Sequence, residues 1–350
     1  MTSGSSKKKI HLKGVLNFVL SIILAVVLLY VAFHDVSLNS ILDVVSHASV
    51  FWIVVLSLTL LLSHFVRAVR WKIILLSVKK DTSLKYLFGS LMVGYAVNCV
   101  VPRLGEVTRA VLIGKWEGLS RSSMFGAVIV ERVIDIIFLG ISVLISVYIW
   151  QEDLYASFPW LKSALYLTMA GIVVFILFIY LTIRFKEHFY GFIVRLLSKV
   201  SKKAADKAAH IFEMLTQGFS SLKGTKNYLL TFGLSIIIML LYAFCSYLGF
   251  FTLFMENIQP VNFAMAWVLM SISGIGVVIP TPGGTGSYHA LAKSTLMLFG
   301  FSEVISLSYA FLTHIISYVL FIFVGFLSFV ILNKRHESLI KVVETGVDEL

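Results

Sequence analysis

Two stretches of helix-breaking residues interrupt long apolar runs, and they constrain the fold more than any other feature of this sequence. The first, Asn98–Arg109, places Pro102 and three charged residues inside an apolar region. The second, Ile279–Ser287, contains two prolines and three glycines. Backbone that leaves a helix at membrane depth survives only where protein or a water-filled cavity covers it, and charges there are costly. Two such segments, one in each half of a chain, are typical of a transporter binding site.

The composition predicts that the surrounding medium is lipid. Of 350 residues, 59% are hydrophobic and 13% are charged, and the mean hydropathy is +0.94, which no ordinary soluble domain approaches. An all-α polytopic membrane protein is therefore expected. The net charge of +11 is explained by the Lys and Arg that collect on cytoplasmic loops, so no nucleic-acid partner is expected. Cys99 and Cys245 lie in apolar runs without the spacing of metal ligands, and no metal is expected.

Six apolar runs are long enough to cross a membrane, which takes about 20 residues. They are residues 14–33, 50–66, 124–150, 161–183, 228–254 and 305–332. The two interrupted runs, 86–113 and 263–299, divide into halves of roughly 12 to 18 residues, so each is expected to be a re-entrant, broken-helix hairpin. Clusters of Lys and Arg, including the one from Arg67 to Lys85, predict cytoplasmic loops and two cytoplasmic termini.

The order helix, helix, hairpin, helix then occurs twice, in opposite orientations, which predicts an inverted repeat. The chain, 1–350, is expected to form one membrane domain, with a first half at about 10–150 and a second at about 161–333. Between them, residues 188–226 are basic and have apolar residues at spacings of three and four. An amphipathic helix on an anionic lipid surface and a solvated linker helix fit this pattern equally well.

The first break carries candidate residues for binding a lipid headgroup. Arg103, Glu106 and Arg109 recur every three residues and share one face if the chain after Pro102 is helical. Asn98 can cap or turn the backbone before them. Arginines in such a place can hold an anionic headgroup, and a carboxylate can orient them.

The apolar run after this break adds Glu131, Arg132 and Asp135. Arg132 is a further candidate for headgroup binding, and Glu131 and Asp135 are expected to form a structural charge network. A closed salt-bridge network that fixes the hairpin and touches no ligand is an equal alternative, because buried pairing alone does not establish function.

The second break carries the other half of the candidate site. A regular helix is excluded by Pro280, Pro282, Gly283, Gly284 and Gly286 together, which leave backbone N–H groups free before a new helix, and the N-terminus of that helix attracts anions. His289 and, one turn later, Lys293 can face the same cavity. A packing role for the glycines explains the pattern equally well. The stretch is not a Walker loop, because no Gly-Lys-Ser/Thr follows.

No catalytic motif stands out. A serine-nucleophile elbow and an aspartate pair suited to catalysis are both missing, so no catalytic residue and no cofactor is expected, and the chain is not expected to be an enzyme. His314 and Ser317 in the last apolar run are candidates for interhelical hydrogen bonding.

Three motifs occur in a fixed order: Asn98-x-x-x-Pro102-x-x-Gly105-Glu106-x-x-Arg109, Glu131-Arg132-x-x-Asp135, and Pro280-x-Pro282-Gly283-Gly284-x-Gly286. Over nearly the whole chain they resemble the lysylphosphatidylglycerol synthase transmembrane-region family, whose members are flippase-like membrane proteins. The resemblance implies lipid translocation or headgroup handling in a bacterial cytoplasmic (inner) membrane, with the motif charges at the site. This sequence departs from the family pattern in two ways. The soluble aminoacyl-transferase domain of the full synthases is missing, and His289 stands where many members have an acidic residue.

We therefore expect a stand-alone, flippase-like protein that moves an anionic or glycosylated lipid between leaflets, with membrane lipid as its substrate. Two alternatives remain open. One is a membrane-embedded lipid aminoacyl- or glycosyl-transferase, and the other is a scaffold for a lipid-synthesis enzyme. A homo-oligomer is open as well, and the sequence names neither the lipid nor the energy source.

Overall fold

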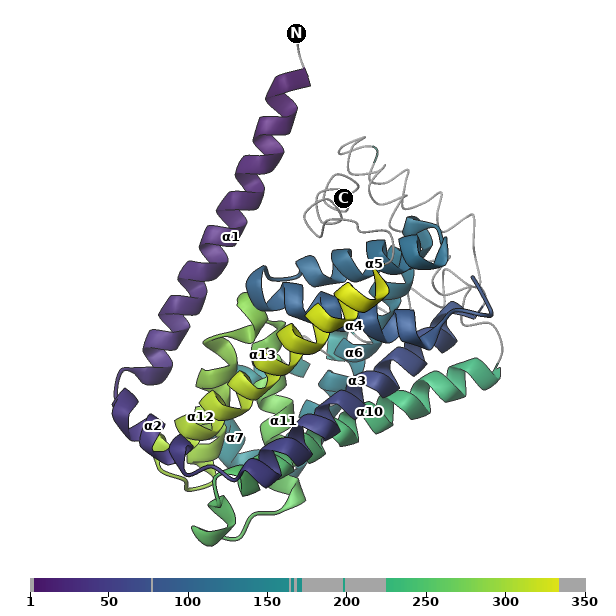
Figure 1. Ribbon diagram of the computed structural model, residues 1–350. Helices are drawn as coiled ribbons and strands as arrows, with labels where there is room; N and C mark the ends of the chain where they lie inside the picture. The colour runs from purple at the N-terminus through teal and green to yellow at the C-terminus, as the bar shows by residue number, and fades with distance from the viewer. Residues whose placement is uncertain are drawn as a thin grey trace. The chain divides into compact units, whose positions relative to one another are not determined.

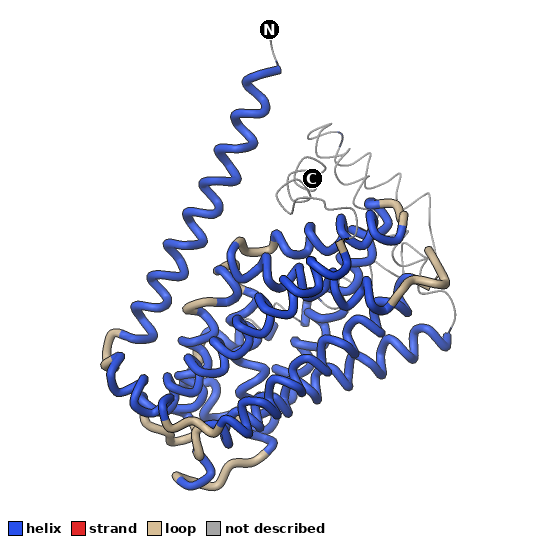
Figure 2. Tube along the Cα trace, viewed as in Figure 1, coloured by secondary structure: helices blue, strands red, loops and turns tan. Residues whose placement is uncertain are grey.

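The computed structural model describes residues 3–76, 78–163, 165–166, 169–171, 198 and 225–333, with side chains described from Leu16 onward apart from residues 121–122 and 151–153. In this part of the chain helices are joined by loops and no strand occurs (Figure 2). The predicted all-helical class is confirmed. Most of the predicted crossing at 161–183 and nearly all of the predicted amphipathic segment at 188–226 lie outside the described residues.

The helices are labelled in chain order in Figure 1. Their bounds are α1 Ser3–Phe33, α2 Leu38–Ser46, α3 Val50–Leu75, α4 Leu84–Val100, α5 Leu104–Glu117, α6 Arg121–Ile149, α7 Gln151–Ser157, α10 Thr225–Thr252, η1 Met255–Asn257, α11 Phe263–Val278, η2 Pro282–Gly284, α12 Ser287–Leu298 and α13 Glu303–Leu332.

Several of these helices begin at a residue whose side chain caps them. The side chains of Ser37, Ser120, Asn262 and Ser302 each accept a hydrogen bond from a backbone N–H in the first turn of α2, α6, α11 and α13. Such a bond satisfies one of the N–H groups that have no partner inside the helix. These polar residues therefore fix helix starts in a chain that is otherwise almost uniformly apolar.

Four helices in the described part of the chain are long and apolar enough to cross a membrane: α1 over Leu16–Phe33, α3, α10 and α13. They agree with four of the predicted crossings. The predicted crossing at 124–150 lies within one continuous helix, α6, which carries four charged residues. It is not among these four spans. The helices fit a multi-pass membrane protein, and the number of six crossings stays a prediction.

Both predicted interruptions separate two helices. α4 ends at Val100 and α5 begins at Leu104, while α11 ends at Val278 and α12 begins at Ser287, with η2 between them. The four helices have 17, 14, 16 and 12 residues, and each is shorter than the about 20 residues that a crossing needs. Re-entrant hairpins related by an inverted repeat are compatible with these lengths and stay a prediction.

The chain divides into two compact units. Unit 1 comprises Met1–Leu62, Gly89–Arg109 and Leu240–Leu350, and unit 2 comprises Ser63–Phe88 and Ala110–Met239. Both breaks belong to unit 1, and α6 belongs to unit 2. That the whole chain is one membrane domain with two inverted halves stays a prediction.

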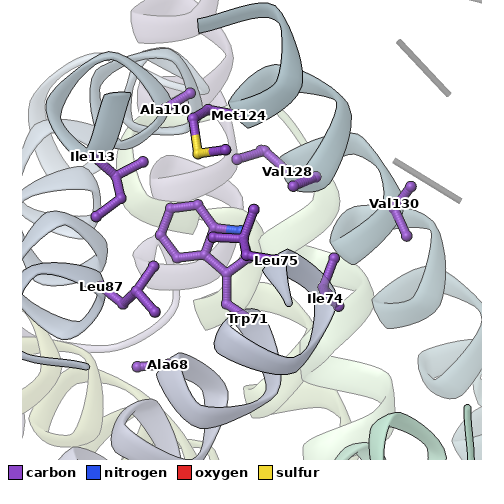
Figure 3. Close-up of a cluster of buried hydrophobic side chains, with 11 residues drawn as sticks. Ala68, Trp71, Ile74, Leu75, Leu87, Ala110, Ile113, Met124, Val128 and Val130 are labelled. Carbon is purple, nitrogen blue, oxygen red and sulfur yellow. The ribbon is translucent and has the colours of Figure 1, made fainter. Parts of the chain in front are cut away.

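Unit 2 has an apolar core around Trp71, whose side chain is fully buried. Figure 3 shows the indole ring in the middle of the cluster, with Leu75, Ile113 and Met124 around it. The buried residues of this core are Ala68, Trp71, Ile74, Leu75, Leu87, Ala110, Ile113, Met124, Ala127, Val128 and Val130. They come from α3, α4, α5 and α6, so this core fixes the ends of those helices that belong to unit 2.

In unit 1, α12 packs against α1, α11 and α13, and α2 packs against α13. A small apolar cluster of Ala32, Val36, Ile41 and Leu307 holds the end of α1 against α2 and α13. α13 also approaches α4 closely, because a Cβ added to Gly325 would lie 2.7 Å from the carbonyl oxygen of Met92. The elements that carry the two breaks are thus packed together within this unit.

The two helices of the first break approach each other through glycines. A Cβ added to Gly105 would collide with the carbonyl oxygen of Gly94, and one added to Gly94 would lie 2.8 Å from the carbonyl oxygen of Gly105. Real Cβ atoms do not approach backbone this closely. Glycine is therefore required at both positions for α4 and α5 to pack as they do.

We expect Gly105→Ala to lower the melting temperature of the protein in lipid nanodiscs. The added methyl group must push two backbones apart, and overpacking of this kind costs about 1–3 kcal/mol. Gly233→Ala in α10 is the matched control, because nothing lies within 4 Å of the added Cβ. It should leave the melting temperature unchanged or raise it, since Ala favours a helix over Gly by about 1 kcal/mol. Equal melting temperatures for the two variants would contradict the close approach of α4 and α5.

Candidate functional site

Asn98 holds the first break together. Its Oδ1 accepts a hydrogen bond of 2.7 Å from the N–H of Gly105, and its Nδ2 donates one of 3.2 Å to Oε2 of Glu106. Gly105 is the second residue of α5, so this bond satisfies an N–H group that has no partner within the helix. The same amide group therefore closes the break and positions the Glu106 carboxylate.

Arg103 lies in the loop of the first break and not in α5. Its φ is +64°, in the left-handed region, which costs a non-glycine residue about 1–3 kcal/mol. α5 begins one residue later, so Arg103 does not share the helical face expected for it with Glu106 and Arg109. Those two lie within α5, where Glu106 is half-buried and Arg109 is buried.

The exposed side chain of Arg103 reaches the second break. Its Nη2 donates to the carbonyl oxygen of Val278, the last residue of α11, at 3.4 Å. This hydrogen bond is long and therefore weak. The other N–H groups of Arg103 have no hydrogen-bond partner among the residues that the structure describes. A guanidinium in this situation can offer paired donors to a phosphate or a carboxylate.

The glycines of the second break are required by the backbone. Gly283, Gly284 and Gly286 have φ values of +54°, +79° and +85°. A Cβ on Gly283 would lie 2.5 Å from the hydroxyl oxygen of Tyr318, and one on Gly286 would lie 2.7 Å from the carbonyl oxygen of Ala25. The left-handed conformation and the close neighbours would both strain any other residue here. The structure thus gives these three glycines a conformational and packing role.

Three N–H groups of this turn are bonded inside it. Gly284 donates to the carbonyl oxygen of Thr281 at 3.1 Å, and Thr285 donates to that of Pro282 at 2.9 Å. The N–H of Gly286 donates to Nδ1 of His289 at 3.3 Å. The expectation that the turn leaves its N–H groups to an anion is therefore wrong for these three, because the tight turn folds each of them onto a nearby acceptor.

Tyr318 of α13 joins the two breaks. Its hydroxyl oxygen lies 2.6 Å from the carbonyl oxygen of Pro282 in the second break and 3.3 Å from that of Cys99 near the end of α4. It also lies 2.7 Å from Oγ1 of Thr285, which in turn lies 3.3 Å from Nε2 of His314. We call Thr285, His314 and Tyr318 the clasp. One side chain from α13 thus contacts the backbone of both broken helices.

His289 and Lys293 lie on the buried side of α12. The ring of His289 is next to that of His314, with the ring centroids 4.6 Å apart. Nζ of Lys293 donates to the carbonyl oxygen of Ala32 at 3.1 Å and pairs with the carboxylate of Glu303 at 3.2 Å. The structure thus brings His289 beside the clasp, and it gives Lys293 partners at the end of α1 and the start of α13.

Unit 2 contains a buried charge cluster, which consists of Arg67, Arg70, Glu131, Arg132 and Asp135. Nε of Arg67 lies 2.6 Å from Oε1 of Glu131, and Arg67 also pairs with Asp135. Nη2 of Arg70 lies 2.5 Å from Oδ1 of Asp135, and Nη2 of Arg132 lies 3.3 Å from Oδ2 of the same residue. Both carboxylates therefore contact more than one arginine.

Helical spacing explains the cluster. Arg67 and Arg70 are three residues apart on α3, and Glu131 and Asp135 are four apart on α6, so each pair lies on one face of its helix. The side chains of Arg70 and Glu131 are fully buried, whereas that of Arg132 is 34% exposed. A buried charge needs its partner, so these pairs fix how α3 and α6 face each other.

Sequence reasoning ended this crossing at Val66 and assigned Arg67 and Arg70 to a basic cluster after it, and the predicted end is wrong. Both lie inside α3, which continues to Leu75. The apolar stretch Ile73–Leu75 after them was the available signal. When the apolar pattern resumes after charged residues, those residues belong to the same helix. A buried carboxylate pair on α6 can then be matched with the two arginines.

The clasp was only partly foreseen. His314 makes the expected bond to another element, with Thr285, but Ser317 donates to the carbonyl oxygen of His314 in its own helix. Tyr318 was not selected, although it follows His314 by one turn on an apolar helix. Two polar side chains one turn apart in such a helix indicate an interhelical contact.

Among the described residues, no group of three or more His, Cys, Asp or Glu could hold a metal.

The sequence profile of a family described as the lysylphosphatidylglycerol synthase TM region matches residues 18–325. That range contains both breaks and the charge cluster. The chain belongs to this family.

Two similar proteins are both named UPF0104 membrane protein. The one from Methanothermobacter thermautotrophicus is 27% identical over 264 residues, which cover 71% of this chain and 76% of the relative. The one from Methanocaldococcus jannaschii is 21% identical over 317 residues, which cover 86% of this chain and 90% of the relative. No solved structure significantly matches the chain.

In this member of the lysylphosphatidylglycerol synthase TM region family, the three motifs lie in two units. The first and third motifs form the two breaks of unit 1, where Asn98 closes the first break and Arg103 and Tyr318 connect the two. The second motif supplies Glu131, Arg132 and Asp135 to the charge cluster of unit 2. Arg132 is thus held by carboxylates of its own helix, while Arg103 reaches across a break.

We expect Glu131→Gln and Asp135→Asn each to lower the melting temperature strongly. Either change leaves three arginines of the cluster sharing one carboxylate instead of two, and breaking buried pairs in this way costs about 3–5 kcal/mol. Asp43→Asn is the control, because Asp43 is exposed on α2; it should change the melting temperature little. If the two cluster variants unfolded at the temperature of the control, the buried pairing of α3 with α6 would be contradicted.

Proposed function

We propose that this protein moves an anionic or glycosylated lipid between the two leaflets of a membrane, and that Arg103 binds the headgroup where the two helix breaks meet. One observation carries the proposal. The guanidinium of Arg103 is exposed at this junction, and among the described residues it is held by one long hydrogen bond to the carbonyl oxygen of Val278. An unpaired cation in an apolar environment is unfavourable, and a phosphate group would compensate it with paired hydrogen bonds.

The two breaks give a headgroup a polar place within an apolar bundle. Helices shorter than a crossing meet there, and their free carbonyl and amide groups are covered by Asn98 and Tyr318. The headgroup would contact this junction while the acyl chains stay in lipid. The carboxylate of Glu106, held by Asn98, would moderate the positive potential. A transport site must bind weakly enough to release its cargo, which one arginine beside a carboxylate allows.

The remaining candidate residues have different roles in this proposal. Gly283, Gly284 and Gly286 shape the junction, and His289 lies beside the clasp. Arg109 and Lys293 are buried, so we place them behind the headgroup and not in contact with it. Arg132 stays a candidate for headgroup binding, because a third of its side chain is exposed.

We place the protein in a cytoplasmic membrane with both termini in the cytoplasm. The clusters of Lys and Arg support this orientation. The names of the two relatives state only that they are membrane proteins, and the lipid itself is part of the proposal. Oligomers and complexes with lipid-synthesis enzymes remain compatible with it.

We expect Arg103→Gly to slow lipid movement about tenfold to hundredfold, because a hydrogen bond to a charged group contributes about 1.5–3 kcal/mol. Glycine relieves the left-handed strain at this position, so the variant should keep or raise the melting temperature. The measurement is the accessibility of fluorescent phosphatidylglycerol, phosphatidylcholine and a lipid-linked sugar to an external quencher in proteoliposomes. Arg103→Lys should retain part of the rate, since it keeps the charge but loses the planar guanidinium.

Lys80→Ala is the matched control, because it removes an exposed cation from the loop between α3 and α4; it should not change the rate. A wild-type rate in a folded Arg103→Gly variant would contradict a headgroup site at Arg103. If wild-type protein moved none of the three lipids, the transferase and scaffold alternatives would be favoured instead. Product formation from a donor and lipid would separate those two.

A further inference from the structure

The clasp contains fewer hydroxyl protons than acceptors. Tyr318 has one hydroxyl proton, and three acceptors lie around it: the carbonyl oxygens of Pro282 and Cys99 and Oγ1 of Thr285. Thr285 also has one proton, which it can donate to Tyr318 or to Nε2 of His314. A hydroxyl group both donates and accepts, whereas a ring nitrogen does one or the other. The donor order along the chain therefore depends on His314.

Two complete arrangements exist. When Nε2 of His314 has no proton, Thr285 donates to it and Tyr318 donates to Thr285. The carbonyl oxygens of Pro282 and Cys99 then receive nothing from Tyr318. When Nε2 carries a proton, it donates to Thr285, Thr285 donates to Tyr318, and Tyr318 donates to the backbone of the breaks. Neutral His314 can adopt either tautomer, but protonated His314 has hydrogen on both nitrogens and permits only the second arrangement.

The neighbouring His289 cannot play this part. Its Nδ1 accepts the N–H of Gly286 at 3.3 Å, so protonation of this nitrogen would set two N–H groups against each other and release the turn. His289 is also only 3% exposed, whereas His314 is partly exposed. The partner of His314 is a hydroxyl group, which accepts as readily as it donates. His314 can thus take up a proton without losing its hydrogen bond.

Two tyrosine rings lie against the ring of His314. The ring of Tyr288 from α12 stacks on it with centroids 5.5 Å apart, and that of Tyr318 lies at 4.6 Å. Aromatic faces stabilise a cation at such distances. The titratable side chains in ring contact with His314 are thus Tyr288 and His289 of α12 and Tyr318 of α13, and Cys99 of α4 contacts Tyr318 through its carbonyl oxygen. No ion pair joins a charged group to either imidazole in the described part of the chain, so the proton itself sets the local charge.

We propose that His314 is a proton-binding site, and that its protonation locks Tyr318 onto the two helix breaks and so gates the movement of lipid. One proton from the solvent binds the ring nitrogen of His314 that carries no hydrogen. The hydroxyl protons of Thr285 and Tyr318 then reorient without leaving their oxygens, and no bond between heavy atoms forms or breaks. We call the donation of Tyr318 to the two breaks on protonation of His314 the lock. The lock involves the clasp alone, whereas its effect on lipid movement rests on the proposed function.

Hydrogen–deuterium exchange of the protein in nanodiscs tests the lock without any lipid transport. Amide exchange in segments 99–104 and 280–287 is compared between about pH 8 and about pH 5, which brackets the ordinary titration of histidine. Each rate is divided by that of an unstructured peptide of the same sequence. Wild-type segments should exchange about threefold to tenfold more slowly at the lower pH, the range that one added hydrogen bond gives.

Three variants break the chain at different points. Thr285→Val keeps both His314 and Tyr318 but removes the hydroxyl relay, His314→Gln removes the titrating group, and Tyr318→Phe removes the final donor. Each should abolish the extra protection at low pH. His34→Gln is the matched control, because His34 is exposed after α1 and pairs with Asp35; it should behave as wild type. Should one clasp variant fail to fold, the other two decide the test.

The same proteins in phosphatidylcholine vesicles with labelled phosphatidylglycerol test the gating. Lipid movement should slow at low pH in wild type and His34→Gln, and not in Thr285→Val. Extra protection that persists in Thr285→Val and His314→Gln would overturn the proton lock, as would its absence from wild type. Protection with no lipid movement at any pH would leave the lock standing and remove the proposed function. Lipid movement with the same pH profile in wild type and Thr285→Val would overturn the gating alone.

Discussion

The structure depends on satisfying backbone groups where helices stop inside an apolar region. A helix that ends at membrane depth exposes N–H and C=O groups that lipid cannot bond. Asn98 supplies an acceptor to the start of α5, Ser287 donates to the carbonyl oxygen of Gly276 at 2.6 Å, and Tyr318 reaches carbonyl oxygens of both breaks. Few side chains do this, so each one constrains the geometry. Any function of the junction must operate with those bonds either kept or exchanged for others.

Unit 2 solves a different problem with charge. Its arginines and carboxylates are buried together, and a buried ion pair rarely adds stability over well-packed apolar residues of the same volume. What it adds is a requirement for one arrangement, because α3 and α6 cannot rotate without separating charges. The apolar core around Trp71 lies on the same stretch of α3. Packing therefore holds these helices together, while the charges select their register.

Residues that shape the backbone locally were predictable from the sequence. Residues whose role depends on a partner far along the chain were not. Proline disrupts the interior of a helix, and clustered glycines beside it weaken the helix further, so Pro102, Pro280 and the glycines after Pro282 located both breaks within a few residues. The roles of Arg70 and Tyr318 depend on partners 65 and 36 residues away, which no local pattern specifies. The left-handed conformation of Arg103 was missed for a related reason. A non-glycine residue adopts it only where the surrounding structure imposes it.

The junction of the two breaks is acted on from two sides. Arg103 touches the end of α11, and Tyr318 touches the second break and the end of α4. If an anionic headgroup takes the guanidinium away from Val278, the junction loses one of its two side-chain ties and depends more on the other. A proton on His314 strengthens that other tie. Ligands that alter the same element are coupled, and the coupling free energy is the same in both directions. Under the two proposals, headgroup binding must therefore change the proton affinity of His314 by the factor by which the proton changes headgroup affinity, so one equilibrium governs both.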